Sequence, residues 1–257
     1  MIIDTHAHYD DEQFDADRQT LLSSEEMTKN GIAAIVNASA NMEGCRATLE
    51  LVNKYDKVYG MLGVHPEDVG SLTGDDYEWI RLNSANQKIV AIGEIGLDYH
   101  YEDNPPKEVQ IKHFRKFIRL AREVNLPINV HSRDATKDTM DIIIEEKASD
   151  VGGIIHCFSS SADVALQYVQ MGFYIGIGGV VTFKNGKKLK EVVEKCPLES
   201  LVLETDCPYL APTGHRGERN SSYYLPAVVS EIALIKGISE EEVLRITEEN
   251  AKKVYKL

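Results

Sequence analysis

The stretch Ile2-Ile3-Asp4-Thr5-His6-Ala7-His8 begins with a short apolar run and ends with two histidines that lie two residues apart. A short apolar run of this kind is typical of a buried strand, which we predict over 2–4. In extended backbone, residues two apart project to the same side, so the imidazoles of His6 and His8 face the same way. The stretch therefore predicts a buried strand that is followed by a pair of candidate metal ligands.

Seven further apolar segments follow along the chain, separated by stretches with helical patterns. They are predicted as strands at 33–37, 58–62, 89–93, 128–130, 153–155, 173–177 and 201–204. Their carboxyl ends recur at roughly the 30-residue spacing of βα units. Eight strands alternating with helices favour a parallel sheet, closed as a (β/α)8 TIM barrel that spans 1–257 as a single domain. The alternative is an open, doubly wound sheet, but no G-x-G-x-x-G pattern follows the first strand.

Two of the intervening helices have recognisable ends. Pro106 favours a helix start, and apolar residues follow it at helical spacing until Leu126-Pro127 ends the pattern. Ser239 stands three residues before Glu242, which predicts a capping box at the start of the last helix.

The chain is acidic, with 28 Lys and Arg against 41 Asp and Glu and a formal net charge of −13. This balance disfavours a general electrostatic grip on nucleic acid or on an anionic membrane. The first residues include no basic or apolar leader, and no apolar run approaches the ~20 residues needed to cross a bilayer. The 4 cysteines show no C-x-x-C spacing. We therefore expect a cytoplasmic protein with reduced thiols, no membrane contact and no obligate protein partner.

Polar side chains follow the predicted strands at their carboxyl ends, which meet at one rim of a barrel. Four imidazoles and two carboxylates stand there: His6, His8, Glu94, His131, His156 and Asp206. Nitrogen and oxygen ligands without a thiolate suit divalent ions such as zinc, manganese or magnesium. Six ligands exceed the three that one catalytic zinc takes, so we predict two divalent metal ions per chain. Glu94 is the natural bridge because the two oxygens of its carboxylate can bind separate ions.

Four other polar side chains near this rim are candidates for substrate binding. Arg133 can pair with a phosphate through two hydrogen bonds, and Arg219 can hold a second phosphate. Tyr99 can stack on a base or a ribose. His65, which precedes a proline, is either a turn residue or a donor to a phosphate oxygen. Ordinary roles stay open for the others too: surface ion pairs for the arginines and packing at the rim for the tyrosine.

Six blocks of sequence contain or adjoin these positions: Asp4-Thr-His-Ala-His8, Gly63-Val-His-Pro66, Gly93-Glu-Ile-Gly-Leu-Asp-Tyr99, Val130-His-Ser-Arg-Asp-Ala135, His156-Cys-Phe158 and Leu203-Glu-Thr-Asp-Cys-Pro208. Together they resemble the signature motifs of the TatD family of metal-dependent hydrolases, and the likeness covers essentially the whole chain. The resemblance implies a TIM barrel, a binuclear metal centre and metal-dependent deoxyribonuclease activity.

The same resemblance divides the ligands between two ions. One ion takes His6, His8, Glu94 and Asp206. The other takes Glu94, His131 and His156. The resemblance also favours a role in substrate binding for His65.

Hydrolysis of a phosphodiester is the leading functional hypothesis. The ions lower the pKa of water toward ~7, and Asp206 is the predicted general base that takes or relays the proton. Glu94 is the second predicted catalytic residue, as the bridge between the ions. Glu204 lies on the same strand face as Asp206 and is expected to orient a ligand. The acidic net charge fits an enzyme that acts on DNA ends or oligonucleotides rather than one that slides along a duplex.

Two other classes of function stay open. The same barrel serves amidohydrolase-like enzymes that hydrolyse a small ester, amide or phosphoester. Glu94 stands where a carbamylated lysine would bridge two ions, and the block around His131 lacks the His-x-x-Glu pattern of a purine deaminase. The third reading is a non-catalytic metal-binding or scaffolding protein, which is disfavoured because none of the six ligands is missing.

Overall fold

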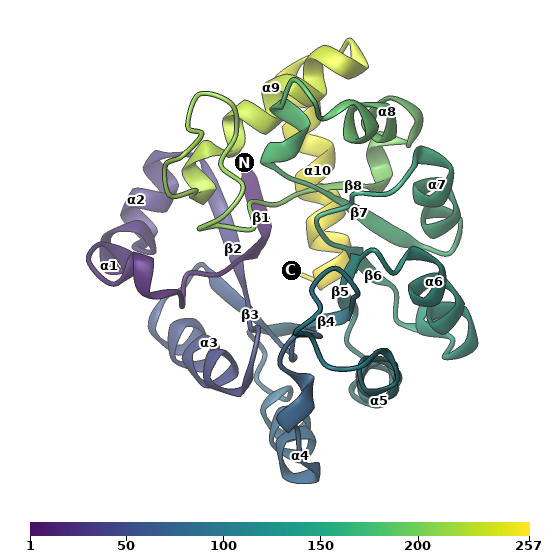
Figure 1. Ribbon diagram of the computed structural model, residues 1–257. Coiled ribbons are helices and arrows are strands. Elements are labelled where there is room, and N and C mark those ends of the chain that lie inside the picture. The colour runs from purple at the N-terminus through teal and green to yellow at the C-terminus, as the bar shows by residue number, and fades with distance from the viewer.

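The computed structural model describes residues 1–257 and contains one sheet of eight parallel strands in the order β1 to β8 (Figure 1). The strands are β1 (Ile2–Ala7), β2 (Ile32–Ala38), β3 (Val58–Leu62), β4 (Ile89–Asp98), β5 (Ile128–Arg133), β6 (Gly153–Ile155), β7 (Phe173–Ile177) and β8 (Leu201–Leu203). All eight predicted strands are present, and three of them have the predicted bounds. The (β/α)8 barrel is therefore confirmed.

Helices surround the strands on the outside, and the last helix of the chain runs behind the barrel toward its centre (Figure 1). They are α1 (Arg18–Leu21), α2 (Ser24–Lys29), α3 (Met42–Lys54), α4 (Gly74–Asn83), α5 (Lys107–Val124), α6 (Thr136–Glu145), α7 (Ala162–Gln170), α8 (Lys187–Lys195), α9 (Leu225–Lys236) and α10 (Glu240–Tyr255). None of these helices combines the length and the apolar character needed to span a membrane.

The two predicted helix ends differ in outcome. Pro106 directly precedes α5, as expected, and Asn125 ends that helix in the left-handed conformation with φ of 55°. At α10, the hydroxyl of Ser239 accepts a hydrogen bond from the amide of Glu242 at 3.2 Å. The return bond from the Glu242 side chain does not form, so the capping box is only half made.

The barrel closes where β1 meets the end of β8. The hydroxyl of Thr5 donates to the carbonyl of Leu203 at 2.9 Å. Just above it, the amide of Asp206 donates to the carbonyl of His6 at 3.0 Å, and the amide of His8 donates to the carbonyl of Cys207 at 2.8 Å. This closure excludes the open, doubly wound sheet. It also brings His6, His8 and Asp206 together where β1 meets the segment after β8.

The barrel interior below the carboxyl ends of the strands is filled by apolar side chains and by the end of the last helix. Met61, Val90 and Val202 are buried there with Tyr255 from the carboxyl end of α10. The hydroxyl of Tyr255 donates to the carbonyl of Thr5 at 2.9 Å. The same hydroxyl accepts from the side-chain amide of Asn129 at 3.3 Å. The filled interior leaves the carboxyl ends of the strands as the place for a site.

We predict that Tyr255→Phe lowers the free energy of unfolding by about 1–3 kcal/mol, because it strips partners from two buried polar groups. Urea unfolding measures this difference. The matched control is Tyr59→Phe, whose hydroxyl makes no hydrogen bond although its ring packs against the same apolar cluster. Equal effects of the two substitutions would contradict the structural role given to the Tyr255 hydroxyl.

Candidate metal centre

The six predicted ligands meet at the carboxyl ends of the strands, around the carboxylate of Glu94. Oε2 of Glu94 lies 3.4 Å from Nε2 of His6 and 3.7 Å from Nε2 of His8. Oδ1 of Asp206 lies 3.3 Å from Nε2 of His8 and 3.7 Å from Nε2 of His6. Two imidazole nitrogens and two carboxylate oxygens thus converge on one point.

A second group of nitrogens faces the other oxygen of the same carboxylate. Oε1 of Glu94 lies 3.0 Å from Nδ1 of His131 and 3.5 Å from Nε2 of His156. Nε2 of His65 is 3.8 Å from the same oxygen. Each oxygen of Glu94 therefore faces its own set of donors, as a bridging carboxylate requires.

Close backbone packing brings these strands together. A Cβ on Gly96 would lie 1.9 Å from the carbonyl oxygen of His131, and Gly96 has φ of 149°, so only glycine fits there. Asp206 adopts the left-handed conformation with φ of 56°, a sparsely populated state of the kind that clusters at functional sites. The loop after β8 is attached to β1 through the buried carboxylate of Asp4. The hydroxyl of Ser222 and the amide of Thr205 donate hydrogen bonds to it at 2.6 and 3.0 Å.

Hydrogen bonds on the far side of two rings fix which nitrogen faces the centre. Nδ1 of His6 lies 2.9 Å from Oδ1 of Asn129, and Nδ1 of His8 lies 2.9 Å from the carbonyl of Ala38. Both partners are acceptors, so each Nδ1 carries a hydrogen, and Nε2 is the nitrogen that presents a lone pair when the ring is neutral. The two Nε2 atoms are 3.1 Å apart. At this distance a proton or a cation must lie between the two nitrogens, and a divalent ion would bind both lone pairs once the proton has left.

Carboxylates lie beside the other two histidines. Nε2 of His131 lies 3.0 Å from Oδ2 of Asp98. Nδ1 of His156 lies 3.4 Å from Oε1 of Glu204 but forms no hydrogen bond with it, so the orienting role of Glu204 stays a prediction. Such outer partners commonly set the tautomer and the direction of a metal-binding imidazole. The donor set therefore fits divalent ions.

The carboxylates remain ionised in this environment. Burial raises the pKa of Glu94, but the neighbouring imidazoles of His156 and His6 outweigh it and hold the pKa well below its usual range. Burial also opposes ionisation of Asp206, whose pKa is nevertheless lowered by His156 and by a hydrogen bond with His8. Two buried carboxylates that stay ionised attract positive charge, which either protonated imidazoles or a divalent cation can supply.

The same carboxylates raise the pKa of two of the imidazoles. Burial lowers the pKa of His8, but Asp206 and Glu94 together raise it to about 9. Burial likewise opposes protonation of His131, and the carboxylates of Asp98 and Glu94 raise its pKa to about 9. In metal-free protein at neutral pH these two rings hold protons, which a metal ion must displace.

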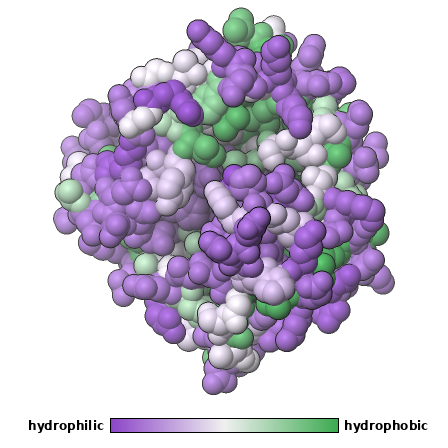
Figure 2. Space-filling view, in the orientation of Figure 1, coloured by the Kyte–Doolittle hydropathy of each residue, from purple (hydrophilic) through white to green (hydrophobic).

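Two of the four candidate substrate residues face the same open cavity as the metal ligands. This cavity has a volume of about 730 Å³ and includes His65 and Arg133 in its walls. Arg133 is the only lysine or arginine that lines it. Its guanidinium lies over the ring of Tyr101, 4.8 Å from the centroid, and donates to the hydroxyl of that tyrosine at 3.1 Å. Figure 2 shows hydrophilic residues around the central hollow of this face.

The other two candidates are engaged elsewhere. The hydroxyl of Tyr99 donates to Asp138 at 2.9 Å, outside the cavity wall. Arg219 forms two hydrogen bonds with Asp17, at 2.9 and 2.6 Å, and does not line the cavity either. The Tyr99 hydroxyl and the Arg219 guanidinium thus already have partners within the chain, and the substrate contacts of these two residues stay predictions.

Sequence reasoning missed several residues of this site. Asp98 lies on the same strand face as Glu94, four residues along β4, so alternation along the strand was a signal that could have found it. Asn129 stands two residues before His131 and carries the same signal. Tyr101 and Tyr209 line the cavity from loops, where no periodic pattern in the sequence indicates which way a side chain points.

Comparison with known proteins agrees with this geometry. A family model described as TatD related DNase matches residues 3–256. The chain belongs to the TatD family of metal-dependent hydrolases. It is 45% identical over 257 residues to the uncharacterized metal-dependent hydrolase YabD of Bacillus subtilis, covering 100% of both chains. It is 34% identical over 259 residues to the hydrolase YcfH of Escherichia coli, covering 99% of this chain and 96% of the relative.

Solved TatD structures share the fold over their whole length. The TatD homologue YjjV of Escherichia coli superimposes with a TM-score of 0.93 at 29% identity, covering 100% of this chain and 98% of YjjV. A TatD family hydrolase from Entamoeba histolytica gives a TM-score of 0.88 at 24% identity, covering 99% and 97% of the two chains. The barrel of this TatD protein is therefore shared across distant organisms.

We predict that protein stripped of metal by a chelator loses stability as the pH rises from about 6.5 to about 9. His8 and His131 have raised pKa values in the folded chain, so the stability gained from their protonation is complete below 6.5 and is lost as pH rises through about 9. The stability gained when metal is added must instead increase with pH, because protons compete less with the metal at higher pH. Urea unfolding at several pH values, with and without metal, measures both slopes.

The control compares two histidines. His8→Gln should flatten the slope of the stripped protein, whereas His215→Gln, in an exposed loop, should leave it unchanged. A stripped protein whose stability rises over this pH range would contradict the arrangement of charges described above.

Proposed function

We propose that this TatD protein is a metal-dependent deoxyribonuclease that removes nucleotides from DNA ends or short oligonucleotides, using two divalent ions such as zinc, manganese or magnesium. The observation that carries the proposal is the division of ligands by Glu94. The ligand atoms of Glu94, His6 and His8 lie within 4.8 Å of one another, and so do those of Glu94, His131 and His156. A pair of ions held in this way suits displacement at phosphorus.

The chain's own residues supply proton transfer and orientation. When bound, divalent ions polarise phosphoryl oxygens and lower the pKa of water. In this proposal the carboxylate of Asp206, which stays ionised beside His8, takes a proton from the attacking water. Arg133 pairs with a phosphate oxygen and His65 donates a hydrogen bond to another, a proposal supported by the position of both in the cavity wall.

The charge of the cavity limits the size of the substrate. Seven carboxylate residues line the cavity against the single guanidinium of Arg133: Asp10, Asp11, Glu67, Glu94, Asp98, Asp103 and Asp206. A duplex with a phosphate on every nucleotide is repelled by such a wall, whereas a strand end presents fewer charges. The same wall favours the second candidate function, an amidohydrolase-like enzyme for a small ester, amide or phosphoester.

The direct test is hydrolysis of end-labelled single-stranded and double-stranded DNA, with a panel of divalent metals and a chelated control. We expect metal-dependent release of nucleotides, faster on single strands than on blunt duplex. Hydrolysis of a small uncharged ester with no action on any DNA would favour the second candidate and contradict the first.

Two variants separate proton transfer from substrate binding. Asp206→Asn should lower kcat by roughly 100-fold or more, because an amide cannot act as a base. Arg133→Ala should act mainly on kcat/KM for DNA, by roughly 10-fold to 150-fold, since charge-assisted contacts are worth about 1.5–3 kcal/mol. The control is Arg122→Ala, which breaks a surface ion pair with Asp150. If Arg133→Ala lowers kcat/KM equally for DNA and for an uncharged ester, phosphate binding by this arginine is refuted.

A further inference from the structure

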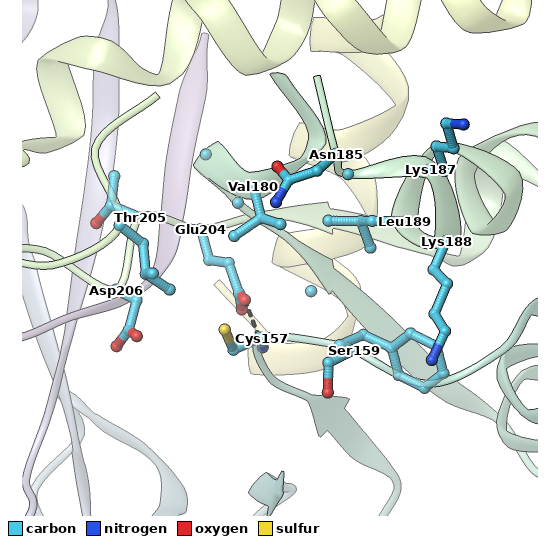
Figure 3. Close-up of a pocket in the computed structure, with 16 residues that line it drawn as sticks. Cys157, Ser159, Val180, Asn185, Lys187, Lys188, Leu189, Glu204, Thr205 and Asp206 are labelled. Carbon is cyan, nitrogen blue, oxygen red and sulfur yellow. Dashed lines mark hydrogen bonds between the residues drawn. The ribbon is translucent and has the colours of Figure 1, made fainter. Parts of the chain in front are cut away.

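A second cavity opens beside the metal centre and has no role in the mechanism described so far. Its volume is about 310 Å³, and its walls come from β7, from the segment Gly179–Thr182, from the start of α8 and from the end of β8 (Figure 3). Asp206 lines both this cavity and the larger one that contains the metal ligands. A group bound in the second cavity therefore lies directly next to the reacting centre.

Two glycines allow the walls of this cavity to pack closely. Gly176 lies on β7 beside β8, and a Cβ on Gly176 would lie 2.1 Å from Oε2 of Glu204. Gly186 packs against the opposite wall, where a Cβ would lie 2.4 Å from the carbonyl oxygen of Val180. Both positions bring backbone close to its neighbours, so the cavity is built by the local sequence.

The walls of the cavity are mainly apolar. Phe158, Val180, Leu189 and Leu210 line it. Figure 2 shows hydrophobic residues gathered near the central hollow, on the side toward α8 and α9. A volume near 300 Å³ lies at the small end of ligand pockets, which suits one aromatic ring system rather than a long chain.

One charged group is buried against this apolar space. The side chain of Glu204 is 1% exposed, and its Oε1 accepts a hydrogen bond from the amide of Cys157 at 2.6 Å. Its Oε2 has no hydrogen-bond partner in the chain. A buried carboxylate oxygen without a partner is unfavourable, and the terminal torsion of a carboxylate turns easily. Glu204 therefore favours a ligand that brings an N–H donor.

The mouth of the cavity is positively charged, unlike the larger cavity. Lys187 and Lys188 are exposed at the start of α8, and both line the opening. No side chain caps the first turn of this helix, so its amide groups are available to an anion. Together these features complement a ligand that combines an apolar ring, an N–H donor and a nearby negative charge.

We propose that this second cavity is a base pocket, which holds an amino-bearing nucleobase of the substrate next to the scissile phosphodiester. The ring lies between Val180 and Leu189, its amino group donates to Glu204, and a flanking phosphate lies near Lys188. This inference rests on the proposed nuclease function and adds a preference for the base at the site of cleavage.

The test measures equilibrium binding of three probes to manganese-loaded protein by calorimetry. The probes are dAMP, the purine deoxyribonucleoside monophosphate that lacks the amino group, and deoxyribose 5-phosphate. We expect dAMP to bind at least about tenfold more tightly than the purine analogue, because the analogue leaves Glu204 without a donor. Deoxyribose 5-phosphate should bind more weakly still.

Val180→Phe should fill the cavity and remove the differences among the three probes. The matched control is Val164→Phe, a partly buried valine on α7 that does not line this cavity. Thermal unfolding and metal content of both variants show that each is folded and loaded. Retained discrimination in folded Val180→Phe would overturn the base pocket.

Hydrolysis of a single-stranded oligonucleotide, measured in parallel, separates this inference from the proposed function. Hydrolysis together with equal binding of all three probes would overturn the base pocket and leave the nuclease proposal intact. Base-dependent binding that Val180→Phe abolishes, without hydrolysis under any metal, would overturn the nuclease proposal and support a nucleotide-binding pocket.

Discussion

The carboxylate of Glu94 is the group on which the rest of the site depends. It is 3% exposed and lies within 3.8 Å of ring nitrogens from five histidines. Burying a carboxylate is unfavourable unless positive charge compensates it. No lysine or arginine reaches Glu94, so the compensation must come from protonated imidazoles or from metal ions. A closed barrel provides this arrangement because the carboxyl ends of its strands point to one centre.

The sequence predicted the barrel well where strands are buried and apolar on both faces. The strands at 58–62, 153–155 and 173–177 have the predicted bounds, because their apolar runs end where the backbone leaves the sheet. β1, β4 and β5 extend further than predicted. Their last residues include His6, Glu94 and His131, which stay extended although they are polar, because they point into the barrel mouth. Polar residues at a strand end are thus a sign of the site itself.

The candidate ligands could be predicted from the sequence because each follows an apolar strand segment. Asp98 was not found because β4 extends beyond the predicted end at 93. Asn129 lies within the predicted strand, but nothing in the sequence shows that its side chain contacts His6. Tyr99 and Arg219 differ from the candidate ligands, because each has a partner within the chain and neither lines the cavity. Their chemistry suits substrate binding, but local partners hold them, and no pattern in the chain reports where a loop side chain points.

A continuous set of contacts links the metal centre to the far end of the molecule. Tyr255 contacts Asn129, Asn129 contacts His6, and His6 faces Glu94. The end of α10 therefore supports the orientation of a ligand that lies at the opposite side of the barrel interior. This link explains how a helix remote from the chemistry stabilises the geometry that the chemistry needs.

The most direct test of the shared carboxylate is the metal content of carefully reloaded protein, measured by elemental analysis. The account predicts two metal ions per chain in the unaltered protein and one or fewer in Glu94→Gln, since an amide cannot bridge two cations. Glu67→Gln, which changes an exposed carboxylate in the same cavity wall, should retain two. No more than one ion in the unaltered protein, or two ions in Glu94→Gln, would contradict a metal pair bridged by Glu94.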